Sequence, residues 1–492
     1  MRKRIETQPK LGTIAIGDIH IDIHSRDEIP KILLGLQHIF VTPSVRNLIL
    51  SKLKSVFPKN ISQNKGRTGM SHWQILVLGM IRLGCNIDYD KLQELANNHK
   101  VIRHMLQHGD LDEHFRYGLQ TLKDNLGLFT EELLRDLNQI VVEAGHKAIR
   151  HKVGVDLQGR CDSFPVQTNV HFPTDLSLLF DSMRKVITLL AVLCLKYNVR
   201  GWRQSSHNLR TIKKLYRKCQ KLRHSTSKDE AVKEKRAKLV VEAYESYVEC
   251  VESFLLRTDA VWVEVLPFLT DLSELARFNA IEHYAKHARK QIDLIRRRVC
   301  NGEKIPHAEK VFSIFEEHTE WLSKGKAGVS QELGLNVCIV EDSYCFILNW
   351  KVMEKESDVK VAVPLIQATS KNHADFRSCS FDKGFHSPEN QKELGKLLEK
   401  AILPKKGKLS QKDREVEGAE EFRGRKRRHS AVESGINALE HSGLDRCPDR
   451  GLKGFKRYVA MAVLARNLQT LGNIIQKKKL KQAKRQMLKK AA

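Results

Sequence analysis

The sequence predicts a mixed α/β fold, in which a sheet domain is interrupted by an all-helical insertion and preceded by an N-terminal helical region. The sheet domain is expected at residues 151–175 and 326–475, because runs of β-forming residues lie at 153–170 and again between 331 and 403. Between them, residues 176–325 show apolar residues at helical spacing. A chain of 492 residues is long enough for two or three domains, each with its own core.

The N-terminal region, residues 1–150, reads as short helices joined by turns. Thr42-Pro43-Ser44 starts a helix that runs to about Phe57, and the polar segment 58–69 reads as a connector. Three further helices are expected at 73–83, 89–96 and 101–107. Because Lys100, Arg103 and His104 fall at the last of these, the region fits a helical DNA-reading module. Ordinary helical packing with solvated basic residues is the alternative.

The first β signal, residues 153–170, carries candidate carboxylates. Asp156 and Asp162 lie in it, and Asp175 follows it. Pro165 interrupts the run, and proline cannot donate to a strand ladder. For each of the three Asp residues, a surface or helix-capping role is the alternative to a functional one.

The helical insertion, residues 176–325, has apolar stripes such as Val240, Ala243, Tyr247, Val251 and Phe254. Its basic blocks, 210–223 and 289–298, could lie against a DNA backbone. A solvated helix face explains each block equally well.

The sheet continues with a hairpin, strands 331–340 and 344–350 separated by Glu341-Asp342-Ser343. A helix at 359–369 leads to a short strand that ends at Asp382. There Gly384 permits a tight turn and Ser387-Pro388 opens a helix. A second short apolar strand, Ile402-Leu403, leaves through a lysine-rich loop.

A helix beginning at Ser430 follows the basic run 423–429. Val432, Ile436, Leu439 and Gly443 form its buried stripe, and Glu433 lies at the rim of that stripe. A helix at 458–471 should cover the sheet. The C-terminal tail, 476–492, holds eight basic and no acidic residues between 477 and 490, and we expect it to be half-disordered and to bind phosphates.

A carboxylate at a strand end and another at a helix rim can meet at one edge of a sheet. Asp382 and Glu433 are placed in this way, and Lys and Arg surround them in the sequence. Such oxygens suit Mg²⁺-dependent chemistry on a phosphodiester.

The composition favours a polyanionic partner. There are 85 Lys and Arg against 58 Asp and Glu, a formal charge of +27, which points to nucleic acid or an anionic membrane. No apolar run reaches the ~18–20 residues of a spanning helix, and no apolar signal core follows Met1-Arg2-Lys3-Arg4. The ten Cys residues form no CxxC pair, so reduced thiols and a cytoplasmic location are expected.

The ordered motifs of the C-terminal half resemble bacterial insertion-sequence transposases of the Asp-Asp-Glu (DDE) type, and more narrowly the ISNCY group. Those motifs are Asp382-Lys383-Gly384-Phe385, Leu403-Pro404-Lys405-Lys406-Gly407 and Arg427-Arg428-His429-Ser430-Ala431-Val432-Glu433. Thr168-Asn169 and Pro173-Thr174-Asp175 also match that group's pattern, as do Glu332-Leu333-Gly334 and the segment 455–469.

The resemblance implies a ribonuclease-H-like catalytic domain, with Asp162, Asp382 and Glu433 as catalytic residues and metal ligands. Asp156 and Asp175 remain rivals for the first position. The implied cofactor is two Mg²⁺ ions, with Mn²⁺ as a substitute. In some related transposases a Lys stands two turns after the catalytic Glu, where this chain has Glu440. Basic residues beside the carboxylates in the fold order are expected to hold DNA phosphates: Lys405, Lys406, Lys408, Arg427 and Arg428.

The expected function is therefore binding of insertion-sequence ends, followed by metal-dependent DNA cleavage and strand transfer. The expected partners are end and target DNA and further copies of the chain, as a homodimer or larger assembly on DNA, in a nucleoid-associated bacterial protein. Two alternatives stay open. One is a DNA-binding protein descended from such an enzyme with an idle site, and the other is a metal-dependent nuclease that cuts without joining.

Overall fold

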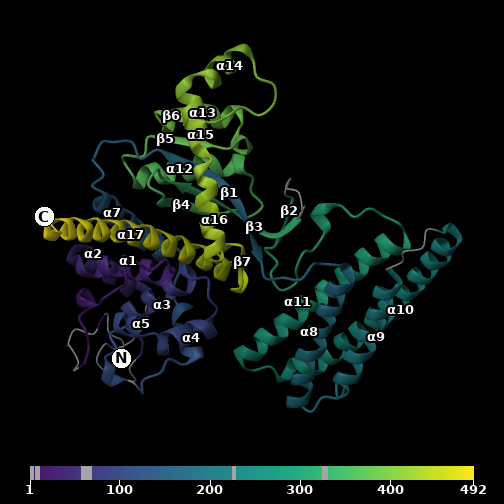
Figure 1. The fold of residues 1–492 in the computed structure, drawn as a ribbon. Helices are drawn as coiled ribbons and strands as arrows, with labels where there is room; N and C mark the ends of the chain where they lie inside the picture. Colours follow the sequence, from purple (N-terminus) through teal and green to yellow (C-terminus); the bar gives the residue numbers. More distant parts are fainter. Residues whose placement is uncertain are drawn as a thin grey trace. The chain divides into compact units, whose positions relative to one another are not determined.

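The computed structural model describes residues 5, 12–56, 69–112, 114–223, 229–323 and 331–491 (Figure 1). The N-terminal basic residues 1–4 and most of the connector expected at 58–69 lie outside this part of the chain. The chain divides into two compact units. The first combines residues 1–169 with 320–492, and the second is residues 170–319.

The first unit contains a mixed sheet of seven strands, so the mixed α/β class predicted from the sequence is confirmed. Its central strand, β1 (Gly159–Thr168), pairs antiparallel with β3 (Gln331–Glu341) and parallel with β5 (Ser378–Phe381). Two further strands, β2 (Glu320–Ser323) and β4 (Ile347–Val352), pair antiparallel with β3. The last two pair in parallel: β6 (Lys400–Ile402) with β5, and β7 (Arg446–Cys447) with β1.

Pro165 does not break β1. Pairing with β5 ends at Cys161 and pairing with β7 begins at Gln167. Between these residues β1 has a strand partner only on the β3 side, and a proline is tolerated where one edge of a strand is unpaired.

The N-terminal helices share one hydrophobic core with the sheet and do not form a compact unit of their own, which differs from the separate domain expected at 1–150. They are α1 (Glu28–Val41), α2 (Pro43–Leu53), α3 (His72–Gly84), α4 (Tyr89–Asn98), α5 (Lys100–Met105), α6 (Leu119–Leu126) and α7 (Glu131–Ile149). Thr42 is the residue before α2, as predicted.

The long helix α17 (Gly451–Ala491) joins the N-terminal helices to the sheet, packing against α1, α3 and α7 (Figure 1). Where it crosses α1, a Cβ at Gly35 would lie 2.5 Å from the Leu468 carbonyl oxygen, and one at Gly472 would overlap the Lys31 carbonyl. The expectation of a half-disordered basic tail was wrong, because α17 continues through it. Consecutive residues with high helix propensity extend the packed helix there.

Five further helices and two short ones lie between the strand β4 and α17. They are α12 (Asp358–Asn372), α13 (Pro388–Leu397), α14 (Gln411–Gly418), α15 (Glu420–His429) and α16 (Ala431–Leu439), together with the 3-10 helix η7 (Lys383–Phe385) and the π-helical turn η8 (Glu440–Leu444). Ser387 caps α13, as predicted. The stripe Val432, Ile436, Leu439 and Gly443 is buried, also as predicted. The basic run 423–429 belongs to a helix of its own.

The second unit is built from α8 (Asp175–Lys196), α9 (Ser205–Arg223), α10 (Glu230–Val265) and α11 (Leu272–Ile295). Its core is separate from that of the first unit and contains Ala243, Tyr247 and Val251, from the stripe that the sequence predicted on α10.

Among the described residues, no single helix has the length and apolar character to cross a bilayer. Within these same residues, α1 and α2 taken together meet that criterion, and they are bent by 99° at their junction.

Candidate active site

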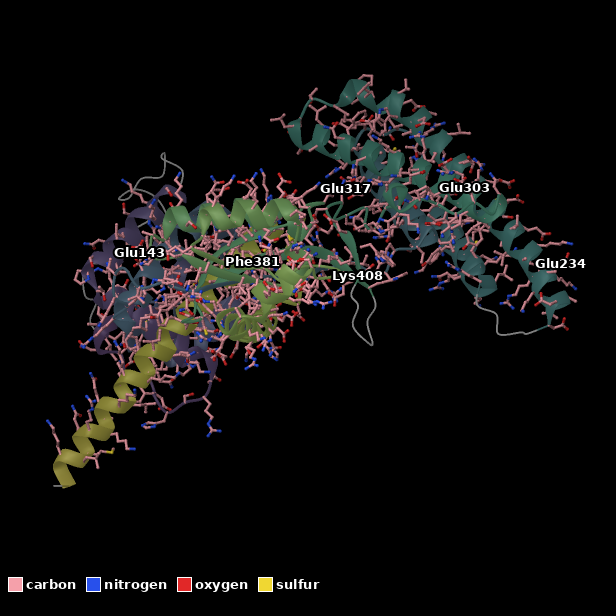
Figure 2. All side chains as sticks on the ribbon, turned by 90° about the horizontal axis from the view of Figure 1, so that it is seen from above. Glu143, Glu234, Glu303, Glu317, Phe381 and Lys408 are labelled. Carbon is pink, nitrogen blue, oxygen red and sulfur yellow. The ribbon has the colours of Figure 1, made fainter. Side chains whose placement is uncertain are left out.

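The sheet places Asp162 and Asp382 next to one another. The last paired residues of the parallel strands β1 and β5 are Cys161 and Phe381, and the two Asp residues follow them directly. Figure 2 labels Phe381 at this position. Glu433, in the first turn of α16, is the third predicted carboxylate.

Electrostatic coupling shows that the three carboxylates belong to one cluster. The pKa of Asp162 is raised to about 6, chiefly by burial and in addition by the negative charges of Asp382, Asp358 and Glu433. The Ser163 N–H donates to Asp162 Oδ1 at 2.8 Å, which opposes the increase only in part. The structure therefore brings together the Asp162, Asp382 and Glu433 that the sequence selected.

Asp358, at the start of α12, is a fourth member that the sequence analysis missed. A Cβ at Gly384 would lie 3.2 Å from Asp358 Oδ2 and 3.9 Å from Asp382 Oδ2, so these two oxygens flank one glycine. Asp358 Oδ1 is buried and has no hydrogen-bond donor among the described residues. Acidic residues are common at helix N-termini, where they interact favourably with the helix dipole. The sequence alone therefore gives no reason to assign Asp358 another role.

His429, the last residue of α15, was also missed. Its Nδ1 lies 3.0 Å from the Ser380 hydroxyl oxygen. Burial lowers the pKa of His429, and the charges of Asp382 and Glu433 oppose that decrease. The imidazole is therefore neutral at neutral pH and lies close to two of the carboxylates. In the sequence it appears only as the end of a basic run.

The rival carboxylates have other roles. Asp156 Oδ1 accepts the backbone N–H groups of Arg377 and Ser378, both at 3.1 Å, so it fastens the segment before β1 to the start of β5. Asp175 belongs to the helical unit, in the first turn of α8, where it pairs with Arg298 Nε at 2.6 Å. Neither contributes to the electrostatics of Asp162.

The seating of α16 depends on a close contact with the sheet. Glu341, at the end of β3, is buried, and any Cβ at Gly435 would collide with its carboxylate. Burial raises the pKa of Glu341 to about 7, while Arg160, 3.7 Å away, opposes the increase. Because Gly435 has no side chain, α16 can approach β3 closely, which fixes the position of Glu433 one half-turn earlier.

A cavity of about 220 Å³ lies between the sheet and α15. The residues that line it include three arginines, Arg160, Arg425 and Arg428, and three serines, Ser343, Ser378 and Ser380. Arg160 is buried and donates to the Asp342 carbonyl oxygen at 2.7 Å. Cations and hydroxyl groups in one cavity provide hydrogen-bond donors suited to an anion.

The predicted phosphate-binding residues fall into two groups. Lys406, Lys408, Arg427 and Arg428 are exposed, and no described acidic side chain pairs with them; Figure 2 labels Lys408. Lys405 is engaged within the protein, since its Nζ pairs with Asp413 at 2.5 Å and its N–H donates to Glu417 at 2.8 Å.

The basic residues expected to read DNA near α5 are mostly structural. Arg103 donates to the carbonyl oxygens of Asn97 and Asp112, at 3.2 and 2.7 Å. His104 is buried, so only Lys100 is exposed to a ligand.

The carboxylate cluster fits a hard divalent cation. It gathers oxygen ligands of like charge, and one of them, Asp358, holds a buried oxygen without a hydrogen-bond donor among the described residues. Burial and the neighbouring carboxylates make Asp162 retain its proton more strongly than usual. No protein-family model, curated protein or solved structure matches this chain.

Proposed function

We propose that this chain is the transposase of a bacterial insertion sequence, and that it binds the ends of its element and catalyses metal-dependent DNA cleavage and strand transfer. The observation that carries this proposal is the convergence of Asp162, Asp382 and Glu433, together with Asp358, beside the ends of the parallel strands β1 and β5.

The strand arrangement supports a ribonuclease-H-like catalytic domain. Along the sheet the order is β4, β3, β1, β5 and β6. In the first three, β3 runs antiparallel to both β4 and β1, and the last three are parallel to one another. A chain that first forms a three-stranded antiparallel meander (β1, β3 and β4) and then adds two parallel strands (β5 and β6) produces this order. The ribonuclease-H-like domain that the sequence resemblance implies has such a sheet.

In this proposal Asp162, Asp382, Glu433 and Asp358 would hold Mg²⁺, which supplies charge neutralisation at the phosphate and favours ionisation of an oxygen nucleophile. Asp162 must lose its proton to serve as a ligand, and its pKa of about 6 leaves it ionised above pH 7. The neutral His429 would position Ser380 through its hydrogen bond, close to the charge of Asp382. Arg428 and the exposed Lys406 and Lys408 would bind phosphates beside the carboxylates.

The second source of DNA affinity is the helical unit. Helix α9 contains no acidic residue, and its cations are exposed without a described acidic partner: Arg210, Lys213, Lys214, Arg217, Lys218, Lys221 and Arg223. The block at 289–298 differs, since Arg289 pairs with Asp259 and Arg296 with Glu252, both at 2.7 Å, which leaves less charge for phosphates. The α9 face is therefore the better candidate for backbone contact.

The test is joining of pre-cut terminal-repeat DNA to a target plasmid by the full chain, with Mg²⁺ and with EDTA. The DNA bounding the reading frame supplies the repeats. A transposase joins the ends only with metal. Cleavage without joined product would identify a nuclease, and end binding with neither activity would identify an idle DNA-binding protein. Either result would overturn the proposal.

A further inference from the structure

We propose that His283, His287 and Glu317 form a binding site for a transition-metal ion of the zinc class in the helical unit. His283 and His287 stand one helical turn apart on α11, so their rings project from the same face. Both Nε2 atoms face the same oxygen, Glu317 Oε1, at 3.4 Å from His283 and 2.7 Å from His287. Nothing in the proposed DNA chemistry uses these residues.

The spacing of the three ligand atoms suits a tetrahedral ion. All three lie within 4.8 Å of one another. Zinc–ligand bonds of about 2.0–2.1 Å at tetrahedral angles separate neighbouring ligand atoms by roughly 3.3 Å. The His283 separation already has this value, and the His287 separation must widen by about half an ångström. Glu317 can make that adjustment because its side chain is 58% exposed.

The ligand types select the metal. Two imidazole nitrogens and one carboxylate suit Zn²⁺, Co²⁺, Ni²⁺ or Cu²⁺, whereas Mg²⁺ prefers oxygen ligands alone. Three protein ligands leave a fourth position for solvent. The helical site and the carboxylate cluster therefore differ in metal preference, and binding to each can be measured separately.

The segment that presents Glu317 is already held in place. The Ser313 hydroxyl accepts the N–H groups of Phe315 and Glu316 at 3.1 and 3.0 Å, and the Phe315 ring lies against Tyr284 of α11, with 6.0 Å between centroids. The carboxylate thus reaches the two histidines from an ordered turn. A bound ion would fasten this segment, which leads to β2, to α11.

Without a metal the same contacts are only a hydrogen bond or ion pair between Glu317 and the two histidines. Isothermal titration of zinc chloride into the EDTA-treated and dialysed full chain distinguishes the two. We expect about one equivalent of zinc at this site. Both His287→Ala and Glu317→Gln should weaken it by at least tenfold, since even residues that only support a ligand contribute about 10–100-fold. His207→Ala, which removes an exposed histidine of α9, is the matched control and should change nothing.

Thermal unfolding gives a second measurement. Zinc should raise the unfolding temperature of the wild type and of His207→Ala but not that of Glu317→Gln. Because Glu317 is exposed, Glu317→Gln should fold normally, so a missing zinc effect reports lost binding. Absence of zinc binding by the wild type would overturn the proposal and leave an ion pair. So would zinc binding that both site variants retain unchanged.

Discussion

Replacing Asp162 with Asn should remove catalysis and, in the absence of metal, make the protein more stable at neutral pH. The folded protein holds the Asp162 proton more tightly than an unfolded chain does, since the pKa rises from an ordinary 3.8 to about 6. Stability of the wild type therefore falls as the pH rises through the window from about 4 to 6, and the cost is complete above it. Asn carries no charge and avoids this cost.

The size of the effect follows from the pKa difference. Between 3.8 and about 6 it corresponds to about 3 kcal/mol. Asp162 is only partly buried, and Asp382 and Glu433 are exposed, so solvent screening reduces this value to about 1–2 kcal/mol. Glu341 titrates in an overlapping range but is present in both proteins, and its contribution cancels in the difference.

The assay is urea unfolding with EDTA at pH 4.5 and pH 8, comparing wild type, Asp162→Asn and Asp90→Asn, an exposed carboxylate of α4 that serves as control. The Asp162→Asn variant should exceed the wild type at pH 8 and match it more closely at pH 4.5. Mg²⁺ should then stabilise the wild type more than the variant. Equal or lower stability of Asp162→Asn at pH 8 would refute the raised pKa of Asp162 and the unfavourable burial of its charge.

Three further predictions concern α16, Asp358 and the DNA surface. Gly435→Ala places a methyl group against the Glu341 carboxylate and should lower the free energy of unfolding by about 1–3 kcal/mol. The control is Gly424→Ala on α15, where a Cβ would meet no atom within 4 Å and stability should not fall. Equal urea midpoints of the two variants would contradict this prediction. Asp358→Asn should slow joining by at least tenfold while Asp175→Asn leaves it nearly unchanged, and the reverse order in a joining assay would mean that the first carboxylate is wrongly assigned. End-DNA binding should weaken with a slope of log K against log salt steeper than roughly −3. Changing Lys213, Lys214 and Arg217 to Gln should make the slope shallower by about one per lost contact, and changing Arg289 and Arg296 to Gln should not; equal effects in fluorescence anisotropy would remove α9 from the interface.

Local sequence was sufficient for the strand that leads to Asp382 and for the α16 stripe, because strand periodicity and helix periodicity act over a few residues. The bounds of other strands differ: β4 is Ile347–Val352 where 344–350 was predicted. It was not sufficient to separate Asp156 from Asp162, since both lie in one β-like run. The distinction comes from Gln158, whose φ of 48° ends the loop and starts β1 at Gly159. Asp156 therefore precedes the strand and binds backbone groups.

Contacts between distant segments could not be read from local patterns. Asp358 joins the cluster because α12 packs against η7, the short helix that follows β5, and His429 because α15 packs against β5 and β6. The N-terminal helices were predicted individually, but their attachment to the sheet depends on the close crossing of α1 and α17 at Gly35 and Gly472. In the sequence, such glycines appear only as residues that destabilise a helix. Their role in close packing becomes apparent once the partner helix is known.

The most direct test of the carboxylate cluster compares joining and end binding for the wild type, Asp382→Ala and Glu433→Ala. Residues that hold the metal are distinct from the basic surface that provides affinity, so both variants should bind end DNA with nearly wild-type strength. Their joining rate with Mg²⁺ should fall below about a hundredth of the wild-type rate, a loss of more than about 2.7 kcal/mol of transition-state stabilisation. Joining above that level by either variant would contradict the assignment of these carboxylates to the catalytic centre.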